Sequence, residues 1–200
     1  MDADAVELRV LGCLIEKQRM TPESYPLSLN GLRLACNQTT NRDPIVEYDE
    51  PTIRAALDRL SRRGWARLAS GAGSRAVKYR HLLDGALRLS DAQLSLLAVL
   101  MLRGPQTPGE LKGRTERLHA FGSLATLEEE LDALRERELV ARLSRRPGQK
   151  EDRYAQLLGG GEPDQPPPSA PEDDRVTALE RRVAVLEGEL AVLQRTLTEK

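Results

Sequence analysis

The segments Leu8-Arg9-Val10-Leu11-Gly12-Cys13-Leu14-Ile15 and Leu94-Ser95-Leu96-Leu97-Ala98-Val99-Leu100-Met101 lie 86 residues apart and share one pattern of large apolar residues. In both, these residues recur at intervals of three, three and one, which is the spacing of one helical face. At the same interval, Thr21-Pro22 corresponds to Thr107-Pro108. Thr at the N-cap with Pro at the first helical position marks a helix start. Each half is therefore predicted to open with an amphipathic helix, a short break and a second helix start.

A third helix and a hairpin also repeat, at an interval of 74 residues. The apolar residues of the third helix correspond as Ile53, Leu57, Leu60 and Leu127, Leu131, Leu134. Two short strand-like segments follow in each half, separated by Gly-containing turns: Ala66–Leu68 and Val77–Tyr79, then Val140–Leu143 and Arg153–Ala155. Three helices and a two-stranded hairpin are the layout of a winged-helix domain. The interval shortens from 86 to 74 because the first half has an insertion at about residues 37–50.

Several longer motifs resemble the YceH-like family of bacterial proteins. They are Tyr25-Pro26-Leu27-Ser28-Leu29-Asn30-Gly31, Ala35-Cys36-Asn37-Gln38-Thr39-Thr40-Asn41-Arg42-Asp43-Pro44, Leu102-Arg103-Gly104-Pro105-Gln106-Thr107-Pro108-Gly109-Glu110-Leu111 and Pro147-Gly148-Gln149-Lys150-Glu151. The resemblance covers about residues 5–158 and implies tandem winged helices. It implies no catalytic or ligand residues, because the family is uncharacterised.

Composition excludes several classes of protein. No apolar run approaches 18 residues, so no transmembrane helix is expected. The acidic N-terminus, Met1-Asp2-Ala3-Asp4, lacks the apolar region of a signal peptide, so a cytoplasmic location is expected. The net charge of −1 is divided as +2 over residues 1–84, +1 over 85–158 and −4 over 159–200. This balance lacks the strong basic signature of a dedicated nucleic-acid binder.

The sequence has no pattern typical of an enzyme or a metal site. GxSxG, P-loop, HExxH and dinucleotide-binding motifs are absent. Cys13 and Cys36 form no CxxC pair, and the only histidines are His81 and His119, so no metal site is predicted. Both cysteines stand among apolar residues, which predicts buried thiols. We therefore expect a non-enzymatic protein without a cofactor.

The third helix of the first half, about residues 51–63, has a face suited to DNA. Opposite its apolar side stand Arg54, Arg59, Arg62 and, at the flank, Arg63, and the hairpin adds Arg75, Lys78 and Arg80. Arginine is the usual reader of guanine and a good phosphate partner. Asp58 lies four residues from both Arg54 and Arg62, where it could neutralise them as local surface pairs.

The repeat provides an internal control for this hypothesis. At the interval of 74, Arg54 and Arg62 become Glu128 and Glu136, and Ala55 becomes Glu129. Carboxylates at these positions would oppose DNA phosphates. The third helix of the second half is therefore predicted not to bind DNA, and a protein partner is its more natural contact.

The inserted segment Asn37–Asp43 has two interpretations. Its polar residues could hydrogen-bond nucleic acid or a small ligand. Alternatively, Asn37 closes the second helix and the segment is a turn, since Asn, Thr and Asp are common turn residues.

The C-terminal residues have a heptad pattern. Apolar residues recur at intervals of three and four: Val176, Leu179, Val183, Leu186, Leu190, Leu193 and Leu197. β-Branched residues at a with Leu at d favour a parallel two-stranded coiled coil, hence a homodimer. The alternative is one amphipathic helix that folds back onto its own chain, since three heptads are short for an independent coil.

The sequence thus predicts a mostly α protein with small β-hairpins (α+β) in four parts. These are winged-helix domains at 1–84 and 85–158, a Gly/Pro-rich linker at 159–175 and a coiled-coil helix at 176–200. One functional hypothesis is a dimeric DNA-binding or transcription-associated protein that contacts DNA through the first domain. The other is a protein–protein adaptor in which both domains are docking modules and no DNA is bound.

Overall fold

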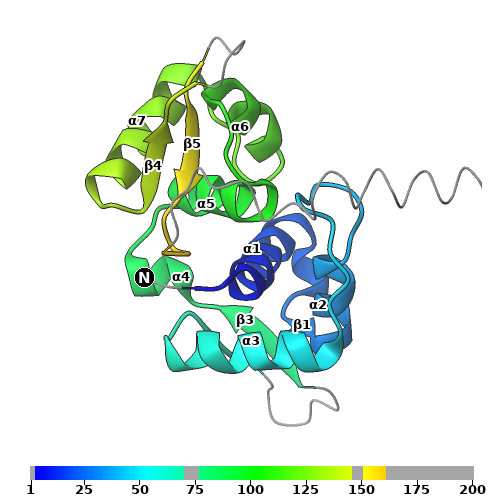
Figure 1. Ribbon diagram of the computed structural model, residues 1–200. Helices are drawn as coiled ribbons and strands as arrows, with labels where there is room; N and C mark the ends of the chain where they lie inside the picture. Colours follow the sequence, from blue (N-terminus) through cyan, green and yellow to red (C-terminus); the bar gives the residue numbers. More distant parts are fainter. Residues whose placement is uncertain (1–2, 70–76, 146–150, 161–200) are drawn as a thin grey trace, which may run out of the picture. The chain divides into compact units, whose positions relative to one another are not determined.

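The computed structural model describes residues 3–69, 77–145 and 151–160, all within one compact unit, Met1–Pro163. The C-terminal heptads, the linker beyond Gly160 and the tips of both predicted hairpins lie outside the described residues. Within the described part, the chain forms seven α-helices, one 3-10 turn and five short strands in two antiparallel sheets (Figure 1). None of these helices is both long and apolar enough to cross a membrane.

The two halves share an order of three α-helices followed by two antiparallel strands. The first comprises α1 (Ala5–Met20), η1 (Pro22–Ser24), β1 (Leu27–Ser28), α2 (Leu29–Cys36), α3 (Glu50–Arg62), β2 (Ala66–Leu68) and β3 (Lys78–His81). After the short α4 (Leu83–Leu87), the second comprises α5 (Asp91–Arg103), α6 (Pro108–Thr115), α7 (Leu124–Glu136), β4 (Val140–Leu143) and β5 (Arg153–Gln156). Three helices and a hairpin therefore occur twice, as the repeat predicts.

The two sheets also correspond. The first has the order β1-β3-β2, with Leu27 opposite Tyr79 and Leu68 opposite the same Tyr79 on its other side. In the second, β4 pairs with β5, and Gln106 bridges to Tyr154 where β1 would stand. Tyr79 and Tyr154 thus occupy the same place in the two halves.

The third helices bury the residues that the sequence predicts. Ile53, Leu57 and Leu60 of α3 are at most 1% exposed, and the corresponding Leu127, Leu131 and Leu134 of α7 are fully buried. α3 begins after Asp49, whose carboxylate accepts a hydrogen bond from the Thr52 amide at 2.9 Å. Ser123 caps α7 in the same way.

The second helix starts where predicted only in the second half. Thr107 caps α6 in a capping box with Glu110. In the first half, Thr21-Pro22 starts only the 3-10 turn η1, with Thr21 at the N-cap and Pro22 at the first position, and not the second α-helix. Thr21 also ends α1, donating its backbone amide and hydroxyl to the Lys17 carbonyl at 3.0 and 3.2 Å. The chain then makes one 3-10 turn and the strand β1 before α2 begins, capped by Ser28.

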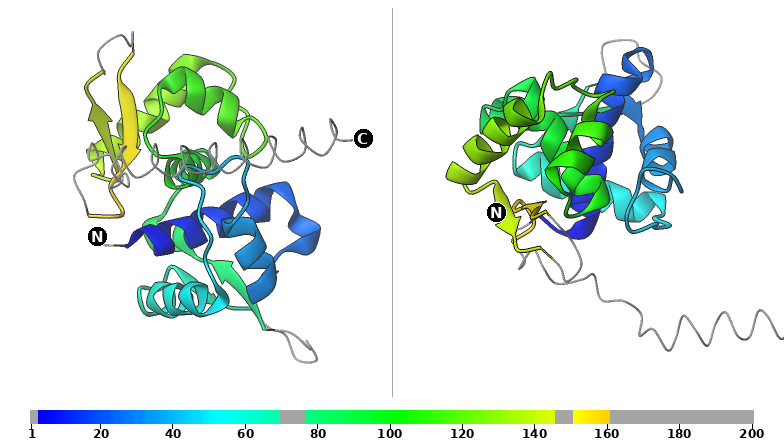
Figure 2. Two further views of the ribbon diagram at one scale, coloured as in Figure 1. Left: turned by 45° about the vertical axis from the view of Figure 1, so that its right-hand side comes forward. Right: turned by 90° about the horizontal axis from the view of Figure 1, so that it is seen from above.

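The first helices are not amphipathic through their middles, which corrects that prediction. Arg9–Ile15 of α1 and Leu94–Leu102 of α5 are buried on all sides. Such burial indicates a helix enclosed within a core. α1 and α5 lie side by side (Figures 1 and 2), so each helix covers the face of the other that its own half leaves open.

The closest approach of these two helices is at Gly12. A methyl group there would lie 2.9 Å from Leu102 Cγ and 3.3 Å from Met101 Cβ. Backbone hydrogen bonds also join the halves, from the Asp43 amide to the Leu102 carbonyl at 2.8 Å and from the Ala3 amide to the Leu158 carbonyl at 3.0 Å. Arg19 and Asp91 form an ion pair across the same boundary.

The Gly12 contact predicts that Gly→Ala substitutions at Gly12 and Gly113 change the free energy of unfolding in opposite directions. Gly113→Ala on α6 meets nothing within 4 Å, so helix propensity should raise the free energy of unfolding by up to about 1 kcal/mol. Gly12→Ala overpacks the α1–α5 contact and should lower the free energy of unfolding by roughly 1–3 kcal/mol. Urea denaturation of both variants tests this. An equal gain for both would contradict close packing at Gly12.

Candidate nucleic-acid interface

Helix α3 presents a buried face to the core and a polar face to solvent. Arg54, Asp58 and Arg62 are exposed along one line of the helix at intervals of four residues. Within the described residues, Asp58 forms no ion pair with either arginine. The local neutralisation that the sequence suggests is therefore not formed, and both guanidinium groups face solvent.

The other two arginines predicted on this helix are held by α1. Arg59 Nη2 lies 2.6 Å from Asp4 Oδ2, and its Nε lies 3.4 Å from Glu7 Oε2. Arg63 Nε lies 3.2 Å from Glu7 Oε1, and its guanidinium stands over the Trp65 ring at 5.8 Å. Because the Glu7 side chain is only 2% exposed, these ion pairs help to attach α3 to α1. Arg59 and Arg63 are thus engaged within the fold.

The hairpin adds positive charge beside α3. Along β3, Tyr79 and His81 are buried, so the alternation of a strand places Lys78 and Arg80 on the opposite, outward face. Arg67 of β2 lies directly opposite Arg80 in the antiparallel register and is exposed. Arg67 was not among the predicted residues, and its place on this surface comes from its register opposite Arg80. Arg75 lies outside the described residues.

Helix α7 has the opposite charge. Glu128, Glu129, Asp132 and Glu136 are all exposed on it. Within the described residues, only Asp132 of these four has an ion-pair partner, Arg135. The adjoining strand residue Arg142 pairs with Asp152, with Nη2 2.6 Å from Oδ2. The acidic helix face predicted for the second half is therefore present.

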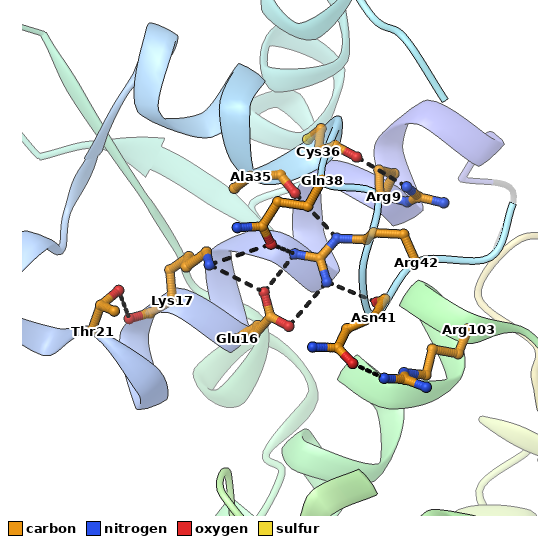
Figure 3. Close-up of polar contacts among 10 residues, drawn as sticks. All are labelled: Arg9, Glu16, Lys17, Thr21, Ala35, Cys36, Gln38, Asn41, Arg42 and Arg103. Atoms are coloured by element: carbon orange, nitrogen blue, oxygen red, sulfur yellow. Dashed lines mark hydrogen bonds and ion pairs between the residues drawn. The ribbon is translucent and has the colours of Figure 1, made fainter. Parts of the chain in front are cut away.

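The insertion is held to the fold by polar contacts centred on the buried Arg42 (Figure 3). The fully buried guanidinium of Arg42 donates to the Ala35 carbonyl at 3.1 Å, to Gln38 at 2.9 Å and to both oxygens of Glu16. The Asn37 side chain both donates to and accepts from the backbone of Tyr48, and Asn37 closes α2. These bonds support the interpretation of the segment as a helix end and turn.

Strand β3 is anchored by the buried His81. Its Nε2 lies 2.5 Å from Gln18 Oε1, and its Nδ1 accepts the Leu83 amide at 3.3 Å. Burial lowers the pKa of His81 to about 4, with Arg80 and Arg19 acting in the same direction and Asp84 against it. The Tyr25 hydroxyl accepts the His81 amide at 2.9 Å, and burial raises the pKa of Tyr25 to about 12.

The two cysteines are free and buried, as predicted. They are also neighbours, since the Cys13 thiol of α1 acts on the Cys36 thiol of α2. That contact and burial both raise the pKa of Cys36. In the described part of the chain, no group of three or more His, Cys, Asp or Glu side chains is placed to hold a metal ion.

The fold and this surface define a mostly helical protein with two small antiparallel sheets and a basic face on its first half. Residues 3–149 match the family described as "Protein of unknown function, DUF480". The chain belongs to this family, which agrees with the resemblance drawn from its motifs.

Relatives match along nearly the whole chain. The UPF0502 protein of Geotalea uraniireducens is 51% identical over 97% of this chain and 91% of its own length. The UPF0502 protein of Serratia proteamaculans is 46% identical over 98% and 94%. That of Opitutus terrae is 50% identical over 90% and 81%.

The His81 environment predicts a loss of stability in mild acid. Between pH 6.5 and 4 the unfolded chain binds a proton at this imidazole and the folded chain does not, so stability falls as pH falls through this window. The slope is at most about 1.4 kcal/mol per pH unit, or roughly 2–3 kcal/mol in total. Urea denaturation at several pH values should show a shallower dependence for His81→Gln. His119→Gln, at a partly exposed site, should keep the wild-type slope, and identical slopes for all three proteins would contradict the assignment.

Proposed function

We propose that this protein is a non-enzymatic DNA-binding protein and that its first half contacts DNA as a winged helix. In that class the third helix enters the major groove and the hairpin lies against the backbone or the minor groove. The observation that supports this best is the shared basic surface of α3 and the β2–β3 hairpin: Arg54, Arg62, Arg67, Lys78 and Arg80.

The roles of the arginines follow from their contacts. Arg54 and Arg62 are exposed on α3, so they are the residues available for base edges or phosphates. Arg67 and Arg80 stand opposite each other on the hairpin and suit phosphate contacts. Arg59 and Arg63 neutralise Asp4 and Glu7, and they support the surface by fixing α3. We assign Arg75 to the same hairpin on sequence grounds alone.

A second candidate function is protein docking through α7. Glu128, Glu129 and Glu136 are exposed and have no ion-pair partner among the described residues, and Leu124 at the start of the helix is 38% exposed. Phosphate repulsion would keep DNA away from this face. A partner with a basic surface suits it, and such docking is compatible with DNA binding by the first half.

DNA binding should depend on the exposed arginines of the first half. Fluorescence anisotropy with random-sequence duplex DNA should show nonspecific binding that weakens steeply with salt. Arg62→Glu/Arg67→Glu should abolish most of it, and the corresponding neutral variants should lower the salt slope by about 0.9 for each lost phosphate contact.

The repeat offers a matched control for this experiment. Arg135→Glu on α7 makes the same charge change as Arg62→Glu alone and should leave affinity unchanged. Binding that is absent at low salt, or that Arg135→Glu weakens as much as the double variant does, would refute DNA recognition by the first half and leave the adaptor function.

We also propose that the heptads at 176–200 pair two chains, a part of the protein outside the described residues. The flanking charges suit a parallel dimer, because Arg182 would face Glu187 of the second copy. Sedimentation equilibrium should give a dimer for the full chain and a monomer for Leu186→Glu/Leu193→Glu. Gly188→Ala, at the outward f position, should stay dimeric. A monomeric wild type would favour the folded-back helix.

A further inference from the structure

A cavity of about 280 Å³ lies between α1, α5, α6 and the inserted segment. Met20 and Glu16 of α1 line one side, and Asn41 of the insertion lines another. The remaining walls come from the second half, through α5, α6 and the turn after α6. The cavity shares no lining residue with the basic surface of α3, so a ligand held in it would not require DNA binding.

Three arginines stand around this cavity: Arg103, Arg114 and Arg117. Arg103 donates to the Asn41 side chain, which fixes it at the rim (Figure 3). Burial lowers the pKa of Arg103, and repulsion from Arg114 and Arg42 lowers it further. The fold therefore gathers like charges here at an electrostatic cost, which a bound anion would relieve.

Two of the acidic groups nearby, Glu16 and Glu110, are already paired with cations. Glu16 accepts from both Nη atoms of Arg42 and lies 3.7 Å from Lys17 Nζ, so two cations share its charge (Figure 3). Glu110 lies 3.3 Å from Arg114 and also accepts the Thr107 amide. Arg117 is exposed and has no ion pair among the described residues. Asp43 of the insertion also acts on Arg103 with the opposite sign, but the three arginines of the cavity still outnumber the two carboxylates, Glu110 and Asp43, that offset them.

The floor of the cavity is apolar. Ala98, Val99 and Leu102 of α5 contribute buried side chains, and Met20 and Leu118 flank them. Arginine heads above an apolar floor suit a molecule with both an anionic group and a hydrocarbon body. A volume near the lower end for small-molecule sites excludes a dinucleotide or a folded peptide.

We propose that this cavity binds a small amphiphilic organic anion, whose carboxylate or phosphate head contacts Arg103, Arg114 and Arg117 and whose apolar body lies on Val99 and Leu102. Guanidinium groups bind either head in a bidentate manner. The arginines therefore select an anionic head, and the apolar floor selects a hydrocarbon body in the same molecule. The site joins both halves of the chain, because Glu16, Met20 and Asn41 belong to the first and all other lining residues to the second.

The test is isothermal titration of the full-length protein with octanoate, octyl phosphate and the neutral octanol. At least one of the two anions should bind with a dissociation constant below millimolar and raise the melting temperature. Octanol and inorganic phosphate alone should each bind at least ten times more weakly, because each satisfies only one part of the site.

Two variants distinguish binding in this cavity from binding elsewhere on the protein. Arg114→Glu/Arg117→Glu should weaken the binding anion at least tenfold while the melting temperature without ligand stays close to wild type, since both side chains are partly exposed. Arg62→Glu, which changes the DNA surface, should bind it like wild type. Failure of both anions to bind, equal binding of octanol, or unchanged affinity in the double variant would each overturn the proposal.

Discussion

The packing of α1 against α5 is the constraint on which the rest of the structure depends. Both helices are buried around their whole circumference over about two turns, and most of the buried side chains are apolar, so neither half can bury its first helix alone. Gly12 lets the two backbones approach until Leu102 fills the space of a missing side chain. The two halves are therefore parts of one core, and this core holds α3 and α7 on either side of the central pair (Figure 1).

Much of this fold could be predicted from the sequence because apolar spacing repeats faithfully. The third helices follow from Ile53, Leu57, Leu60 and their counterparts, and the hairpins follow from strand-like segments separated by Gly-containing turns. The remaining differences arise in part from tertiary contacts. Glu110 completes a capping box with Thr107, whereas Ser24 stands at the same distance after Thr21, and in the first half β1 pairs with β3 before α2 begins. Helical periodicity cannot show which helix will cover the remaining face of α1.

The sequence identifies most of the arginines that lie at the candidate site, but it does not show which of them are engaged in contacts within the fold. Charge and spacing single out the arginines of α3, but the contacts of Arg59 and Arg63 with Glu7 join residues more than 50 positions apart. Such long-range pairs leave no trace in a local pattern. Arg67 likewise joins the surface through a pairing across the sheet, because its partner in the register is Arg80. The comparison of α3 with α7 remains the most informative evidence, because one scaffold presents opposite charges at equivalent positions.

The insertion in the first half explains why two similar repeats behave as one unit. Its Arg42 is buried on Glu16 of α1 and on the Ala35 carbonyl of α2, which fixes the segment at its own half. From there, the Asp43 amide caps the Leu102 carbonyl near the end of α5, and Asn41 accepts from Arg103. Asn41 adopts a φ of 59°, a left-handed conformation that Asn tolerates better than most residues. The second half has no counterpart to this segment. The insertion that interrupts the repeat is thus the same segment that links α1 to the C-terminal end of α5. It also contributes Asn41 to the cavity between these helices.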